Sequence, residues 1–98
     1  MKHRILITAV LALTLGAALP ASAECYADYK AKQARPLRLH YGVIKLPDDI
    51  CDDRRAAAEF IESHLERNGW QLLNVMSLFD RDGLAERKVS AGKFFLRY

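Results

Sequence analysis

Hydrophobic residues recur at every second position over residues 37–46, which is the period of a β-strand with one buried face. The apolar side of this strand holds Leu37, Leu39, Tyr41 and Val43. The other side holds Arg38, His40 and Gly42 and is expected to be the polar, solvent-facing side. Gly42 within the strand indicates a bulge or a close packing contact, and Pro47 is expected to end the strand.

The next pattern is helical. Over residues 54–68 an apolar stripe recurs at spacings of three and four residues, and it consists of Ala57, Phe60, Ile61 and Leu65. Either Asp52 or Asp53 is expected to cap the N-terminus of this helix with its carboxylate. Gly69 follows the helix at the position where a left-handed C-cap belongs.

The remaining segments are assigned by their composition and by the Pro and Gly residues that bound them. Residues 70–79 and 93–98 are rich in apolar and aromatic side chains and are predicted to be strands. Residues 26–34 are rich in Ala, Lys and Gln, so they are predicted to form a short helix that ends before Pro36. The polar residues 84–92 are expected to form a mobile hairpin loop between the last two strands.

These elements predict an α+β fold in which one helix covers a three-stranded sheet, in a β-α-β-β arrangement preceded by a short N-terminal helix. A right-handed crossover places the first two strands parallel to each other. The last strand then pairs between them, which gives a sheet order of 1-3-2. Because one helix covers only one face, the other face needs a cover, either the N-terminal helix or another chain.

The same patterns predict the core. Its expected members are Tyr41, Val43, Phe60, Ile61, Leu65, Gly69, Trp70, Leu72, Val75, Phe94 and Leu96. Trp70 is large enough to pack the end of the helix against the sheet, and a core role is favoured for it over a role as a ligand platform.

Three segments of the chain carry a resemblance. Residues 41–46 read Tyr-Gly-Val-Ile-Lys-Leu, residues 68–75 read Asn-Gly-Trp-Gln-Leu-Leu-Asn-Val, and residues 94–97 read Phe-Phe-Leu-Arg. With the helix between them, they resemble a family of small bacterial β-α-β-β proteins of unknown function, over about residues 39–98. The leader, the cysteine pair and the connection at residues 80–92 depart from the family pattern and indicate an exported branch. The resemblance implies a fold and no activity, cofactor or catalytic residue.

The first 23 of the 98 residues have the order of a secretory signal peptide, with a basic start, an uncharged run at residues 5–19, and small residues before the cut. Ala21 and Ala23 occupy the two small positions, so cleavage is predicted after Ala23 and the mature chain begins at Glu24. A membrane anchor is disfavoured, because 15 helical residues span about 22 Å and the hydrocarbon core is about 30 Å thick. The mature domain, residues 24–98, then has no transmembrane segment and resides in an exported compartment, most simply the periplasm.

Removal of the leader also changes the charge. The whole chain has 15 basic and 12 acidic residues, but Lys2 and Arg4 leave with the leader, so the mature chain has 13 basic residues and a net charge of +1. A nucleic-acid binder is therefore not expected. Cys25 and Cys51 are the two cysteines, and in an exported domain an even count predicts a disulfide. No metal-ligand spacing accompanies them.

No catalytic constellation is visible in the mature chain, which has three serines, no threonine, and the histidines His40 and His64. His40 is expected at the surface beside Arg38, and His64 is expected to pack at the edge of the helix stripe. The basic residues fall into an early group and a late group, namely Lys30, Lys32, Arg35 and Arg38, then Arg87, Lys88 and Lys93. If the two groups met in space they would attract an anionic partner or lipid surface.

The sequence therefore favours a non-enzymatic, exported interaction module without a cofactor, which binds a protein partner or a second copy of itself through the sheet face or a sheet edge. Peripheral contact with a membrane is compatible with the sequence, but no feature of the sequence supports it. The alternative is a binder of a metal or small ligand, or a small enzyme, that uses His40, His64 and the acidic residues.

Overall fold

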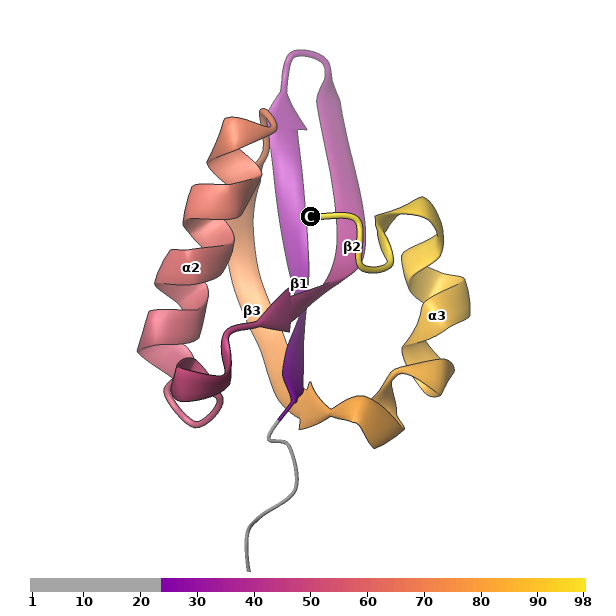
Figure 1. Cartoon of the computed structure of the whole chain (residues 1–98). Coiled ribbons are helices and arrows are strands. Elements are labelled where there is room, and N and C mark those ends of the chain that lie inside the picture. Colours follow the sequence, from indigo (N-terminus) through magenta and orange to yellow (C-terminus); the bar gives the residue numbers. More distant parts are fainter. Residues whose placement is uncertain (1–23) are drawn as a thin grey trace, which may run out of the picture.

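The computed structural model describes residues 24–98, and the predicted signal peptide with its cleavage positions Ala21 and Ala23 lies outside them. The described chain is an α+β domain with one sheet and two α-helices (Figure 1). The main elements are β1 (Cys25–Ala34), β2 (Leu37–Leu46), α2 (Arg54–Arg67), β3 (Gln71–Asp80) and α3 (Ala85–Ala91). None of the helices in this part of the chain is long and apolar enough to cross a membrane.

The sheet has three strands in the order β2-β1-β3, and β1 is antiparallel to both of its neighbours. The predicted N-terminal helix at residues 26–34 is wrong, because this segment is the central strand. Its side chains alternate between the two faces of the sheet, with Cys25, Ala27, Tyr29 and Ala31 on one face and Tyr26 and Asp28 on the other. Pairing along both edges outweighs the helix propensity of its Ala, Lys and Gln residues.

The predicted strand at residues 93–98 is also wrong. A 3-10 helix, Gly92–Phe94, occupies its beginning, and one parallel bridge between Val43 and Phe95 is its only pairing in the described chain. The two edge strands β2 and β3 do run parallel to each other with an antiparallel strand between them, as expected. The strand that fills the centre comes from the N-terminal side of the domain instead of the C-terminal side.

Helix α2 begins at the predicted residue, ends one residue earlier than predicted, and has caps at the predicted positions. The Asp53 carboxylate accepts a hydrogen bond from the Ala56 N–H at 3.0 Å, which satisfies a free donor of the first turn. At the other end Gly69 has a φ of 81°, and the Trp70 N–H donates to the Leu65 carbonyl at 2.9 Å. This is a Schellman C-cap, and it turns the chain directly into β3.

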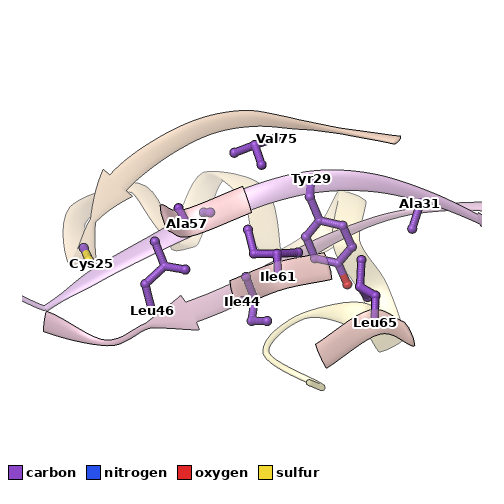
Figure 2. Close-up of a cluster of buried hydrophobic side chains, with 10 residues drawn as sticks. Cys25, Tyr29, Ala31, Ile44, Leu46, Ala57, Ile61, Leu65 and Val75 are labelled. Carbon is purple, nitrogen blue, oxygen red and sulfur yellow. The ribbon is translucent and has the colours of Figure 1, made fainter. Parts of the chain in front are cut away.

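One face of the sheet packs against α2, and Figure 2 shows strand and helix side chains pointing toward one another across this core. The helix contributes Ala57, Ile61 and Leu65, all fully buried. The predicted disulfide is present: Cys25 of β1 and Cys51 before α2 are joined, with a Cα–Cα distance of 5.6 Å. A ring of about 27 residues stabilises the fold by about 3.5 kcal/mol on the chain-entropy model.

The other face of the sheet packs against α3, so residues 84–92 are not the expected hairpin loop. Leu84, Arg87 and Ala91 recur at spacings of three and four, and these are the residues of this segment that lie against the sheet. Ala91 packs with Tyr26 and Val43 in a second, smaller cluster. The cover that the second face needs is therefore supplied in part by the chain itself.

The positions expected in the core divide into three sets. Val43, Ile61, Leu65 and Val75 are buried, and Tyr41, Phe60, Trp70, Leu72 and Phe94 are partly buried. Gly69 and Leu96 are exposed instead. Gly69 stands at the helix cap, outside the layers, and Leu96 follows the 3-10 helix with a φ of 55°, which directs its side chain out of the sheet.

Gly42 makes the close packing contact that a glycine within a strand indicates. A Cβ atom at this position would lie 2.4 Å from Oη and 2.5 Å from Cζ of Tyr29, whose side chain is fully buried. We expect Gly42→Ala to reduce the free energy of unfolding by about 1–3 kcal/mol, because the ring has no room to retreat. Chemical denaturation followed by circular dichroism measures the loss.

The double variant Gly42→Ala/Tyr29→Leu tests the cause of this loss. Leucine removes the atoms that the new methyl group meets, so the double variant should lose less stability than the two single variants together. Additive losses would show that the Tyr29 ring is not what excludes a side chain at position 42.

Candidate functional site

His40 does not lie at the surface with Arg38, as the sequence predicted. It pairs with Ala31 of β1, so its side chain is on the α2 face of the sheet, and it is 8% exposed. The even-numbered positions of β2 form the core face, which holds His40, Gly42, Ile44 and Leu46. The expected apolar side, with Leu37 and Leu39, is in contrast the more exposed side at this end of the strand.

Aromatic rings enclose the imidazole of His40. Phe94 stacks on it with a centroid distance of 3.6 Å, and Trp70 meets it edge-on at 4.3 Å. His40 Nε2 and the Tyr29 hydroxyl are hydrogen-bonded at 2.9 Å, and Nδ1 has no partner within residues 24–98. Burial, together with the nearby Lys93 ammonium, lowers the pKa of His40 to about 4, and burial raises the pKa of the Tyr29 hydroxyl. His40 is therefore a neutral packing residue at neutral pH.

His64 lies at the edge of its helix. Its ring is 4.1 Å from that of Phe60, and Nδ1 is 3.1 Å from the Phe60 carbonyl oxygen. Within residues 24–98, no three His, Cys, Asp or Glu side chains lie close enough together to hold a metal ion. The contacts of both histidines are thus packing contacts, and the structure does not bring them together with the aspartates.

A buried carboxylate lies on the opposite face of the sheet. Asp28 accepts hydrogen bonds from Ser77 Oγ at 2.6 Å, from Tyr41 Oη at 2.7 Å and from Arg87 Nε at 2.9 Å. Burial alone would raise the pKa of Asp28, but these three donors and the Arg87 charge together lower it. Arg87 also donates to the Gly83 carbonyl and stacks over the Phe79 ring at 3.9 Å. This cluster ties α3 to the sheet.

Beyond the reach of α3, the same face of the sheet is open. Figure 1 shows the β1–β2 hairpin extending past α3. Leu37 and Leu39 of β2 are 67% and 66% exposed there, and Leu73 of β3 is 47% exposed. A shallow groove of about 300 Å³ lies between Leu39 and Leu73, and it is lined by Lys30, Ala31, Leu39, His40, Tyr41 and Leu73. We call the surface formed by Lys30, Lys32, Leu37, Leu39, Tyr41 and Leu73 the open face.

The hairpin that carries most of the open face is strongly basic. Residues 29–47 contain the basic residues Lys30, Lys32, Arg35, Arg38 and Lys45 and no acidic residue. Of these five, Lys45 alone is ion-paired within the described chain, with Glu24 at 4.0 Å. Lys30 and Lys32 follow Tyr26 and Asp28 on the same face of β1, and Lys32 pairs directly with Leu39, so cations and leucines interleave on one surface.

The late basic group has other partners. Arg87 is bound to Asp28, whereas Lys88 and Lys93 stand 5.9 Å and 5.5 Å from the ring centres of Phe95 and Phe94. Arg87 thus stabilises the fold through its ion pair with Asp28, and the early group of basic residues forms the basic surface of the hairpin. Sequence reasoning missed the open face because it assigned Leu37 and Leu39 to the apolar side of the strand, which was expected to be buried. The basic run without acidic residues was the signal that could have found it.

The chain matches no protein-family model, no curated protein and no solved structure. The function is therefore inferred from the structure of the chain itself, and the resemblance to the β-α-β-β family stays a prediction.

The tie between α3 and the sheet gives one prediction. Arg87→Ala leaves the buried Asp28 carboxylate without its cation, so it should reduce the free energy of unfolding by about 3 kcal/mol. Glu86→Ala is the control, because Glu86 contacts the same guanidinium at 3.1 Å from a 71% exposed side chain and should cost less than about 0.5 kcal/mol. Urea denaturation compares them, and equal costs would contradict a buried, charge-dependent tie.

The burial of His40 gives a second prediction. The unfolded chain binds a proton at His40 near pH 6.5, whereas the folded chain binds it only near pH 4, so acid favours the unfolded state between these values. The contribution of neutral His40 to stability is fully present above pH 6.5. As the pH falls to 4, as much as about 3 kcal/mol of it should be lost.

The variant His40→Phe isolates this effect, because phenylalanine does not titrate and keeps an aromatic ring against Phe94 and Trp70. Unfolding free energies of both proteins are measured from pH 7 to pH 4. The difference between them should shift in favour of the variant as the pH falls, and a constant difference would rule out proton uptake by His40 on unfolding.

Proposed function

We propose that this protein is a non-enzymatic interaction module that binds an acidic, partly apolar segment of a protein partner through the open face. The observation that carries the proposal is the interleaving of exposed leucines with cations on one side of the β1–β2 hairpin. Leu37 and Leu39 are both two-thirds exposed, and Lys32 lies directly across from Leu39. Large apolar side chains grouped in this way at a surface are typical of an interaction site.

The charge of the hairpin supports an acidic partner. Four of its five basic residues, Lys30, Lys32, Arg35 and Arg38, have no ion pair within the described chain, so an incoming carboxylate gains attraction there without displacing an internal one. A second copy that docked through the same face would bring like charges together. The proposal therefore commits to a different chain, and self-association through the open face is an outcome that the experiment distinguishes.

The polar clusters of the fold favour binding over catalysis. Asp28 and His40 are the buried polar residues of the described chain, and each is packed by its neighbours. The surface of the groove on the open face is mainly apolar, and Lys30 is the charged residue in its lining. Export of the mature chain and its place in the periplasm are part of the same proposal, which the Cys25–Cys51 disulfide supports.

Binding is tested with a defined probe, the fluorescein-labelled peptide Glu-Leu-Glu-Val-Glu-Leu-Glu, against the oxidised protein in fluorescence anisotropy. We expect saturable binding that weakens with added salt, and no binding of the matching peptide with Lys in place of Glu. Leu39→Asp and the pair Lys30→Glu/Lys32→Glu should each weaken binding at least tenfold.

Val89→Asp is the matched control, because Val89 is 91% exposed on α3, outside the open face. Equal effects of Leu39→Asp and Val89→Asp would overturn the proposal. Dimerisation in analytical ultracentrifugation that Leu39→Asp abolishes would replace the acidic partner with a second copy. Tighter binding to anionic phospholipid vesicles than to the peptide, lost in the same variants, would replace it with a membrane surface.

A further inference from the structure

We propose that the acidic segment binds as an added β-strand along the outer edge of β2, at residues 37–41, with its apolar side chains on the open face. This inference rests on the proposed function and specifies its geometry. The open face alone offers three exposed leucines, and the burial of so few side chains is offset largely by the entropy lost when two molecules associate. A specific complex needs further contacts, and unpaired backbone groups lie beside those leucines.

The chain already uses the edge of β2 in this way. Its C-terminal segment forms a parallel bridge between Phe95 and Val43, and the Leu96 N–H donates to the Val43 carbonyl at 2.8 Å. The polar backbone groups of Val43 therefore point away from β1. Because these groups alternate along a strand, those of Leu37, Leu39 and Tyr41 point outward as well.

The C-terminal segment leaves the edge after one bridge. Leu96 has a φ of 55°, which ends extended pairing, and Phe94 and Tyr98 pack toward His40 on the α2 face. Within residues 24–98, no backbone hydrogen bond from outside the sheet reaches Leu37, Leu39 or Tyr41. This part of the edge is a template for an extended segment that continues where the C-terminal segment stops.

The other edge of the sheet is less suited to an added strand. The pairing of β3 with β1 shifts register twice, between Asp28 and Tyr29 and between Lys30 and Ala31, and such bulges interrupt the regular spacing of a strand edge. The Arg54 side chain also donates to the carbonyls of Val75 and Met76. β2 has the same register with β1 along its whole length, so its edge is regular.

The two sides of the β2 edge differ in chemistry and predict the pattern of the bound segment. Leu37 and Leu39 project on the open face, and Arg38 projects on the α2 face between them. A strand added here places alternate side chains beside the leucines and beside Arg38. The segment should therefore alternate apolar residues over the open face with acidic residues beside Arg38. Lys30 and Lys32 then attract the segment through their longer-range charge and are not the direct partners of its carboxylates.

Two N-methylated forms of the Glu-Leu-Glu-Val-Glu-Leu-Glu peptide test strand addition. One carries N-methyl groups on the amides of the Glu residues and the other on the amides of Leu and Val, so charge and side chains are retained while alternate donors are lost. An added strand directs only one set of amides at β2. One form should bind at least tenfold more weakly than the parent peptide, and the other within about threefold.

Amide hydrogen exchange of the protein, followed by NMR, gives a second readout. The amides of Leu39 and Tyr41 should exchange at least tenfold more slowly in the complex, whereas those of Arg38 and His40, which face β1, should change little. If the parent peptide binds but both methylated forms bind equally and the Leu39 and Tyr41 amides are unprotected, strand addition is wrong and the open face acts through side chains alone. If the parent peptide does not bind, the proposed function itself fails.

Discussion

The position of β1 at the centre of the sheet is the constraint on which the rest of the structure depends. Because it pairs along both edges, β1 contributes side chains to both layers of the domain, with Tyr29 toward α2 and Tyr26 toward α3. The Cys25–Cys51 disulfide fixes the start of this strand beside the start of α2. A domain of 75 described residues supports two small cores in this way, and each of them needs β1 in place.

The two buried polar groups follow from the same arrangement. His40 lies opposite Ala31 on the α2 face, and its hydrogen bond to Tyr29 links β2 to the central strand. Asp28 lies on the α3 face and gathers Tyr41, Ser77 and Arg87 from β2, β3 and α3. Each polar group thus joins separate elements of the fold. Because hydrogen bonds are directional, they fix the relative positions of these elements more strictly than apolar contacts would. The hydrogen bonds of both groups are thus made to other elements of the fold.

The parts of the fold that local pattern determines were predictable, and those that tertiary pairing determines were not. The α2 stripe, its Asp53 cap and the left-handed Gly69 can be read from residues close in sequence. The Ala- and Lys-rich β1 is a strand because two neighbours hydrogen-bond to it, a fact that its own composition does not contain. His40 shows the same limit. The alternation at the start of β2 predicts that the odd-numbered side, with Leu37 and Leu39, is buried, but the core face is the even-numbered side, which carries His40.

The open face follows from the lengths of the elements. Strands of ten residues extend about 33 Å, whereas the seven residues of α3 span about 10 Å of helix. Helix α3 is tied to Asp28, in the first half of β1, by Arg87. The tip of the hairpin, which consists of the second half of β1 and the first half of β2, therefore lies beyond the end of α3. The C-terminal segment could have covered that region, but Leu96 turns it toward His40 instead. Leu37, Leu39 and the adjacent edge of β2 are uncovered because Phe94 and Tyr98 pack around the imidazole instead. The open strand edge, at which strand addition is proposed, is thus a consequence of how His40 is packed.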